Sequence, residues 1–418
     1  MTATPPRYPV TRRSLLIGAG GAAVSAPAIV RAKGLSGIRT VVIGAGVFGA
    51  WTAEHLRRAG HQVTLVDSFG PAHSRSSSGG ESRMTRAGYG KDAIYARMAR
   101  DSLVEWKRLS QTAGLPILNP HGVLFFFQGD NDYLRDSLAV HRQIGLPTEA
   151  LTAAQMTRRF PMIDFTGVSA GMFEPGFGAL MARRSVQTLA KNFAANGGTF
   201  RQAAVIPPLP DEARLTTLRL ADGSTIEADR FVFACGPWLP KLFPDLLAGR
   251  IVATRQEIFT FVPPAGDPRY QPARMPGWAD FNGGDVYYGF PDLEGRGVKF
   301  AHDAHGVEVD PDTQSRVPSD AALAEVIAFR DRRFPGLRGA ALATAEVCQY
   351  ENSSNGDFLI DRHPRWSNAV LVGGGSGHGF KHGPEVGRLA AGLLDGKLPL
   401  EPRFSFAAKA KTQKREVI

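Results

Sequence analysis

Cysteine is scarce in this chain, which contains two cysteines among 418 residues. Cys235 and Cys348 stand far apart, so metal sites built from Cys-x-x-Cys pairs are excluded, and the spacing does not suggest a disulfide. The net charge is +10, but basic patches with interleaved aromatic residues are missing. Binding to nucleic acid needs such a patch or a known module, so we expect none.

Long, strongly apolar runs are also missing. A transmembrane helix needs about 20 mostly apolar residues, whereas the mildly apolar stretch that ends near Val30 is short and rich in glycine. We therefore expect no stable insertion into a membrane. Acidic residues are absent from residues 1–32, so this first segment is basic as well as mildly apolar.

That first segment has the features of an export signal. Arg12 and Arg13 precede the apolar stretch, and small residues that suit cleavage stand at Ala28 and Ala32. This combination resembles a twin-arginine (Tat) signal, so we expect residues 1–32 to engage the Tat translocon and the mature protein to be periplasmic or secreted. An uncleaved membrane anchor is one alternative. A dinucleotide-binding loop is another, although no strand pattern precedes these glycines.

A second glycine string stands in a different context. The apolar run at residues 38–43 predicts a buried strand, residues 50–59 predict a helix, and residues 61–67 predict another strand. A strand, a glycine turn, a helix and a strand that ends in an acid form the dinucleotide-binding pattern. The glycines of this pattern are Gly44, Gly46 and Gly49.

Each element of the pattern has a chemical reason. Gly44 allows the tight turn, Gly46 lets the backbone approach a pyrophosphate, and Gly49 lets the helix pack on the strand. The helix N-terminus favours the negative charge of the phosphates. Asp67, at the end of the second strand, can accept hydrogen bonds from a ribose. We therefore expect these residues to bind a dinucleotide.

Two later segments indicate that the dinucleotide is FAD. Residues 228–238 are similar to the strand that returns to the cofactor in FAD enzymes, and residues 369–377 end in a third glycine cluster before a helix near residues 385–394. Widely separated pieces suit an extended flavin that crosses a whole sheet. We expect Gly377 and Gly379 of the third cluster to contact the cofactor.

Several specific motifs follow one another along the chain, namely IGAGVFGAWTAEHL, GGESRMTRAGYG, MFEPGFGAL, FACGPWLPKL, YYGFPDLEGRGVKFAHD, VDPDT, EVCQYENSSNGDFLIDRHP and GGGSGHGFKHGPEVG. With them the chain resembles the monomeric sarcosine oxidase and N-methyltryptophan oxidase family of FAD-dependent amine oxidases. The resemblance extends from about Thr40 to the C-terminal region. It implies oxidation of an amine or amino acid, with O2 as the electron acceptor and hydrogen peroxide as a product.

The resemblance also implies roles for individual side chains. Arg86 and Lys381 match the two cations that hold the substrate carboxylate in this family, and two converging cations fix its orientation. Tyr350 matches a tyrosine on the substrate side, and Arg83 matches an arginine beside the flavin. Lys299 matches a lysine that promotes the reaction with oxygen, where a cation stabilises superoxide as it forms.

A covalent link to the cofactor is implied at one cysteine. Cys348 matches the family cysteine that forms a thioether with the flavin 8α-methyl group. Without its surrounding motif this cysteine would be more typical of a small buried apolar residue. Cys235 lies in an apolar strand pattern, and we interpret it as such a buried residue.

The chain departs from the family pattern near the substrate. Members that oxidise sarcosine have a histidine where Asp303 stands, with His302 as its neighbour here, and a pair of histidines where Ser78 and Gly79 stand. These departures put the covalent link and the oxygen reactivity in question, and they make sarcosine itself a less favoured substrate.

The expected fold class is α/β, with a Rossmann-like FAD-binding domain of the glutathione-reductase type and a second domain built on a mixed sheet. The FAD-binding domain is expected to be discontinuous and to comprise residues 38–118, 185–250 and 345–400. The substrate domain is expected to comprise residues 119–184 and 251–344. Residues 407–418 are expected to form a frayed basic tail.

The resulting functional hypothesis is an exported, monomeric FAD-dependent oxidase of secondary amines such as N-methyl or cyclic amino acids. One alternative is an FAD-dependent dehydrogenase that passes electrons to a quinone or a carrier protein. The other is a catalytically silent flavoprotein that serves in binding or assembly, but the joint presence of Arg86, Lys381, Lys299 and Cys348 argues against it.

Overall fold

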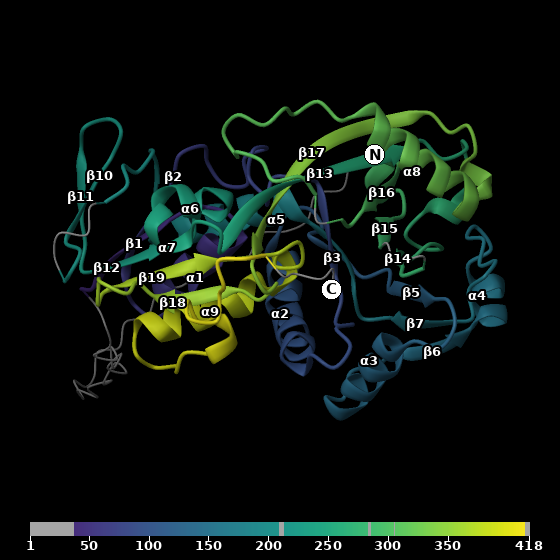
Figure 1. The fold of residues 1–418 in the computed structure, drawn as a ribbon, viewed down its shortest axis with the longest axis horizontal. Coiled ribbons are helices and arrows are strands. Elements are labelled where there is room, and N and C mark those ends of the chain that lie inside the picture. Colours follow the sequence, from purple (N-terminus) through teal and green to yellow (C-terminus); the bar gives the residue numbers. More distant parts are fainter. Residues whose placement is uncertain (1–36, 209–212, 283–285, 305, 414–418) are drawn as a thin grey trace, which may run out of the picture. The chain divides into compact units, whose positions relative to one another are not determined.

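Two large β-sheets organise the computed structural model, which describes residues 37–208, 213–282, 286–304 and 306–413 (Figure 1). The export signal predicted for residues 1–32 lies outside the described residues. Figure 1 shows β1, β2, β12, β18 and β19 of the first sheet on the left and several strands of the second on the right.

The first sheet has the strand order β18-β19-β12-β1-β2-β9. Strands β19, β12, β1, β2 and β9 run parallel, and β18 is antiparallel to β19. Helix α1 (Val47–Arg58) connects β1 to β2, which is the strand, helix, strand unit expected from the glycine pattern. The strands are β1 (Arg39–Ile43), β2 (Gln62–Asp67), β9 (Thr199–Gln202), β12 (Arg230–Phe233), β18 (Leu359–Arg362) and β19 (Ala369–Gly373).

Both faces of this sheet are covered, which explains why its strands read as continuous apolar runs. Val42 and Val232 point to the face that α1 and α9 (Gly383–Leu394) cover. Val41 and Phe231 point to the opposite face, toward the first residue of α6 (Leu239–Leu242). Successive side chains of a strand alternate between faces, so one run of apolar residues contributes to two cores.

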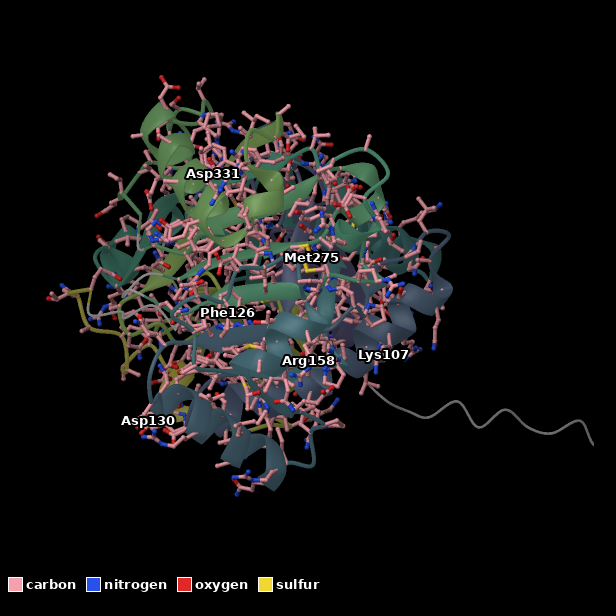
Figure 2. The ribbon with its side chains drawn as sticks, turned by 90° about the vertical axis from the view of Figure 1, so that its right-hand side faces the viewer. Lys107, Phe126, Asp130, Arg158, Met275 and Asp331 are labelled. Atoms are coloured by element: carbon pink, nitrogen blue, oxygen red, sulfur yellow. The ribbon has the colours of Figure 1, made fainter. Side chains whose placement is uncertain are left out.

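The second sheet is mixed and has the order β17-β13-β16-β15-β14-β5-β7-β6. Strand β14 is parallel to β5, and the other neighbours are antiparallel. Phe126 of β5, labelled in Figure 2, is fully buried in this sheet. The strands are β5 (Val123–Phe127), β6 (Glu149–Thr152), β7 (Ala170–Glu174), β13 (Ile251–Phe261), β14 (Gly277–Asp280), β15 (Tyr287–Phe290), β16 (Val298–His302) and β17 (Leu342–Ser353).

Helices and two small sheets complete the described part of the chain. The small sheets are β3 (Ser82–Thr85) with β8 (Gly178–Met181) and β4 (Leu118–Asn119), and β10 (Thr217–Arg219) with β11 (Thr225–Glu227). The α-helices are α1 (Val47–Arg58), α2 (Ala93–Thr112), α3 (Asp132–Gln143), α4 (Ala153–Arg159), α5 (Ala182–Ala195), α6 (Leu239–Leu242), α7 (Pro244–Leu247), α8 (Asp320–Arg333) and α9 (Gly383–Leu394).

The long antiparallel pair β13 and β17 carries chemistry-bearing residues from the second sheet toward the first. Cys348 pairs with Gln256 in this ladder, and Tyr350 pairs with Thr254. A short 3-10 helix, η5 (Phe380–His382), precedes α9 and lies at the end of the third glycine cluster. The site described below forms where these segments meet.

The expected fold class, α/β with a second mixed sheet, is confirmed. The domain boundaries remain a prediction. The basic tail expected from Ala407 onward also stays a prediction. Within it, the Lys409 side chain is fully buried and donates to the carbonyl oxygen of Arg403 at 2.7 Å. Among the described residues, no helix is long and apolar enough to cross a membrane.

Candidate functional site

A cavity of about 480 Å³ opens at the carboxyl ends of β1, β2 and β12. In open α/β sheets this edge is the usual position of a ligand, and the volume is in the range of small-molecule and cofactor sites. Asp67, Cys235 and Tyr350 are among the residues that line it. We call it the dinucleotide cavity.

The glycines of the first turn create the space for this cavity. Gly44 has φ +102°, and a Cβ there would lie 2.2 Å from the carbonyl oxygen of Ala234. A Cβ on Gly49 would lie 1.8 Å from the carbonyl oxygen of Gly44, so helix and strand pack directly on each other. Gly46 lines the cavity, and a Cβ there would meet only Ser78 Oγ, at 3.4 Å. Gly44 and Gly49 are therefore required by packing, whereas Gly46 leaves room for a ligand.

Asp67 holds the loop that follows β2. One carboxylate oxygen accepts a hydrogen bond from the Ala45 amide at 2.7 Å, and the other accepts from the amides of Phe69 and Gly70, each at 2.8 Å. The carboxylate lines the cavity beside the first turn of α1. It therefore ties the glycine turn to the β2 loop as well as facing the ligand space.

Glu351 is a polar residue of the cavity wall that the sequence motifs did not reveal. Its side chain is 5% exposed, and its Oε1 has no hydrogen-bond partner among the described residues. Burial raises the pKa of Glu351 to about 8. A buried oxygen that lacks a partner indicates a ligand that satisfies it.

The dinucleotide cavity fits FAD. Gly46 leaves space beside the N-terminus of α1, where a pyrophosphate is stabilised, while Asp67 and Glu351 present oxygens to hydroxyl groups. Gly377 and Gly379 line the other end. A Cβ on Gly377 would lie 2.7 Å from the Tyr350 ring, and a Cβ on Gly379 would lie 2.7 Å from the Phe48 ring.

A second cavity of about 60 Å³ adjoins the first, and we call it the substrate cavity. The two cavities share the lining residues Arg83, Tyr350, Gly377 and Phe380. The substrate cavity also contains Arg86 and Lys381, which are 8% and 4% exposed. The structure therefore brings the two predicted carboxylate-binding cations together, next to the dinucleotide cavity.

The ring of Tyr89 supports both cations. Arg86 Cζ lies 4.4 Å and Lys381 Nζ lies 4.9 Å from its ring centroid. The Tyr89 hydroxyl bonds to Nδ1 of His378 at 3.1 Å and Nε2 of His382 at 2.7 Å. These two histidines flank Lys381 in the sequence, so one tyrosine connects the β3 side of the site to η5. Sequence reasoning missed Tyr89, although it stands three residues after Arg86.

Lys381 is held in an environment that disfavours its charge. Burial, with a further contribution from Arg86, lowers the pKa of Lys381 well below its ordinary value. Its Nζ donates to the carbonyl oxygen of His378 at 2.9 Å. Behind Arg86, burial raises the pKa of the fully buried Glu174, which accepts a hydrogen bond from the Ala87 amide at 2.9 Å. An anion between the two cations would stabilise the charged form of Lys381.

Three predicted residues form a cluster next to the residues that line both cavities. They are Arg83, Cys348 and Lys299. Arg83 Nη2 lies 3.1 Å from Cys348 Sγ, and Lys299 Nζ donates to the carbonyl oxygen of Ser82 at 3.0 Å. Burial, together with the charge of Arg83, lowers the pKa of Lys299 to about 7. Among the described residues that line the two cavities, Arg83 is present, whereas Cys348 and Lys299 are not. The two cysteines form no disulfide, and Cys235 lines the dinucleotide cavity.

The departures from the family pattern have structural consequences. A Cβ on Gly79 would lie 2.1 Å from the carbonyl oxygen of His73, so this backbone has no room for a histidine. Ser78 Oγ instead accepts from the Val47 amide at 3.0 Å, at the start of α1. His302 does not replace the missing histidine, because its Nδ1 lies 2.8 Å from the Glu325 carboxylate on α8.

The DAO family model, described as FAD dependent oxidoreductase, matches residues 39–393. Monomeric sarcosine oxidase of Streptomyces avermitilis is 31% identical over 361 residues, which cover 84% of this chain and 92% of that protein. N-methyl-L-tryptophan oxidase of Salmonella heidelberg is 28% identical over 365 residues, which cover 86% of this chain and 95% of that protein.

A solved structure shares the fold. The crystal structure of L-proline dehydrogenase from P. horikoshii superposes with a TM-score of 0.78 at 20% identity, covering 89% of this chain and 97% of that chain. At this identity the likeness concerns the arrangement of the sheets and helices.

Proposed function

Because this chain belongs to the DAO family of FAD dependent oxidoreductases, we propose that it oxidises secondary amines that carry a carboxylate and uses O2 as the electron acceptor. The observation that carries the proposal is the pair Arg86 and Lys381 in a small cavity that shares its wall with the dinucleotide cavity. N-methyl and cyclic amino acids have the required combination of amine and carboxylate.

Bound FAD supplies the acceptor for the hydride and the reductant for O2, while the protein supplies binding and orientation. Arg86 and Lys381 bind the carboxylate, which restores the charge that burial disfavours on Lys381. Two charged donors also fix the orientation of the substrate. The amine gives up the hydride in its uncharged form, so the bound zwitterion first loses one proton to water. The oxidised product is an imine, which hydrolyses in water.

The residues shared by the two cavities place the oriented substrate next to the dinucleotide. Tyr350 and Phe380 line both cavities and so border the substrate next to the dinucleotide. Tyr288 and Tyr350 are hydrogen-bonded to each other, and burial raises the pKa of Tyr288 to about 12. Both phenols therefore remain protonated at neutral pH and line the cavity with uncharged groups.

We assign the reaction with oxygen to Lys299. Its side chain is close enough to Arg83, which lines the dinucleotide cavity, for the two charges to interact, and a cation at this position would stabilise superoxide as it forms. A dehydrogenase that donates electrons to a quinone or carrier is the alternative, and it would not need this cation.

One experiment tests the proposed function. Purified enzyme is incubated in air with N-methyl, cyclic and primary amino acids, and hydrogen peroxide, oxygen and amine are measured together. We expect peroxide to form in a one-to-one ratio with the amine consumed. Reduction of a dye without oxygen consumption would favour the dehydrogenase, and an Arg86→Ala variant with unchanged turnover would remove the carboxylate-binding role.

We further propose that Cys348 carries FAD covalently. The proposal is supported by the motif around Cys348 and by its contact with Arg83, which lines the dinucleotide cavity. Acid precipitation separates the possibilities. Yellow colour in the pellet, lost in a Cys348→Ala variant, is expected, and colour in the wild-type supernatant would reject the link.

Export through the Tat translocon to the periplasm or the medium is also proposed, on the basis of Arg12 and Arg13 and the acid-free segment that contains them. A pathway that moves folded proteins suits an enzyme that must bind FAD before export. Fractionation of cells that express the wild type and an Arg12→Lys, Arg13→Lys variant tests it, and we expect the variant to remain in the cytoplasm. We propose a monomer as the working form, which light scattering of the purified enzyme tests.

A further inference from the structure

Asp303 brings a carboxylate into the substrate cavity. It follows β16, and its amide donates to the carbonyl oxygen of Val286 at 2.7 Å, which continues the pairing of β15 with β16. Because side chains alternate along a strand, Asp303 shares a face with Lys299 and Ala301. His302 belongs to the opposite face, where its ring stacks on Tyr287 at 4.5 Å.

Among the described residues that line the substrate cavity, Asp303 is the one acid, whereas Arg83, Arg86 and Lys381 are cations. Its charge acts on Tyr288 and Tyr350, whose pKa values are raised first by burial and then by Asp303. It also acts on Arg86 and Lys381. The cavity therefore contains both signs of charge within a volume of about 60 Å³.

This distribution of charge matches an amino acid better than a simple carboxylate. At neutral pH a secondary amino acid is a zwitterion, with one carboxylate and one ammonium group. Arg86 and Lys381 suit the carboxylate of the substrate. The Asp303 carboxylate, in the same cavity, suits the ammonium group of the substrate.

We propose that Asp303 is a specificity-determining residue that binds the protonated amine of the substrate while Arg86 and Lys381 hold its carboxylate. This inference rests on the proposed function and adds the recognition of the amine to it. It explains why an acid is suitable at a position where sarcosine-oxidising relatives have a histidine.

The test compares ligands that differ only in the nitrogen. N-methylglycine is paired with methoxyacetate, and L-proline with tetrahydrofuran-2-carboxylate. Each ligand is titrated into the FAD-loaded enzyme without oxygen, and binding is followed by the change in flavin absorption. For an amine that reduces the flavin, the concentration dependence of the reduction rate gives the dissociation constant.

In the Asp303→Asn variant we expect amine ligands to bind about 10- to 100-fold more weakly, because a hydrogen bond between charged groups is lost. Binding of the ether ligands should stay the same or become tighter, because a negative charge is removed. Asp303→Glu should restore part of the preference for the amine. His302→Asn, on the opposite face of β16, is the matched control and should leave both affinities unchanged.

Two results would overturn the inference. One is an equal change in the affinity for amine and ether ligands in Asp303→Asn, which would make Asp303 only a counter-ion of Arg86 and Lys381. The other is a wild-type enzyme that does not prefer the amine of either pair. If amines bind with this preference but none reduces the flavin, the proposed function fails while the role of Asp303 in recognition stands.

Discussion

Arg86 and Tyr89 lie three residues apart in the sequence and in direct contact in the structure, with Arg86 Cζ 4.4 Å from the Tyr89 ring centroid. The same ring lies 4.9 Å from Lys381 Nζ, at the other end of the chain. A cation over an aromatic face gains about 0.5–2 kcal/mol. The ring therefore offsets part of the repulsion between two buried cations when no anion is bound.

The Tyr89 hydroxyl should position His378 and His382, and with them Lys381, rather than change the charge of the site. Tyr89→Phe keeps the ring but loses the bonds to His378 and His382. We expect the KM for the amine to rise about 3- to 10-fold, as for the loss of a net hydrogen bond, with the limiting rate of flavin reduction nearly unchanged. Stopped-flow reduction without oxygen measures both quantities. A large fall in the limiting rate with an unchanged KM would contradict a positioning role.

Lys381 should make the binding of anions depend on pH. Only its protonated form attracts a carboxylate, and burial lowers its pKa. The affinity for acetate should therefore fall as the pH rises, at pH values well below those at which an ordinary lysine titrates. Lys381→Met should bind acetate about 10- to 100-fold more weakly at low pH and lose this pH dependence. Titrations followed by flavin absorption test this, and parallel pH profiles for wild type and variant would count against it.

How much of this site could be predicted differs from residue to residue. The β1, α1 and β2 unit follows local rules, so the sequence predicts it almost completely. Helix α1 begins at Val47 rather than at Ala50 because the last glycine of the turn, Gly49, is already inside the helix. Arg86 and Lys381 could be predicted only through their family motifs, because nothing local brings residues of such distant segments together.

Other features depend on contacts that no local pattern contains. Tyr89 belongs to the site because its hydroxyl bonds to His382 of η5. Glu351 belongs to it because it lines the dinucleotide cavity together with the third glycine cluster. The basic tail contains a contact of the same kind. Lys409 looks like part of a solvated basic segment, yet its ammonium group finds the carbonyl oxygen of Arg403 in the interior. Composition alone does not reveal such a partner.

Lys299 should control reoxidation of the reduced enzyme. Burial and the charge of Arg83 lower its pKa to about 7, so the protonated fraction falls as the pH rises above neutrality. We expect the rate constant for the reaction with O2 to fall over the same range. Lys299→Met should lower this constant about 100- to 1000-fold, the usual effect of losing one stabilising group for a developing anion.

The control for this prediction is the other half-reaction. The rate of flavin reduction by the amine should change little in Lys299→Met, and Lys299→Arg should keep part of the oxygen reactivity at high pH. Stopped-flow mixing of the reduced enzyme with buffers of known oxygen content provides the measurement. Equal oxygen rate constants in wild type and Lys299→Met would remove Lys299 from this step.

Glu351 should make the stability of the cofactor-free protein depend on pH. Burial raises its pKa to about 8 in the folded protein, from an ordinary value of 4.5. Between these two values the folded state keeps a proton that the unfolded chain has lost. The free energy of unfolding therefore falls as the pH rises from about 4.5 to about 8, and the contribution of Glu351 is fully lost above that range.

Glu351→Gln cannot ionise and should not show this decline. In a Cys348→Ala background, from which FAD can be removed, we expect the variant to match its parent near pH 4 and to unfold about 2–4 °C higher at pH 8.5. Glu227→Gln, which changes an exposed carboxylate of β11, is the control and should follow the parent at every pH. Because Glu351 lines the dinucleotide cavity, FAD should bind to Glu351→Gln with an altered dissociation constant. Identical melting curves for Glu351→Gln and the parent at pH 8.5 would show that Glu351 ionises freely in the folded protein.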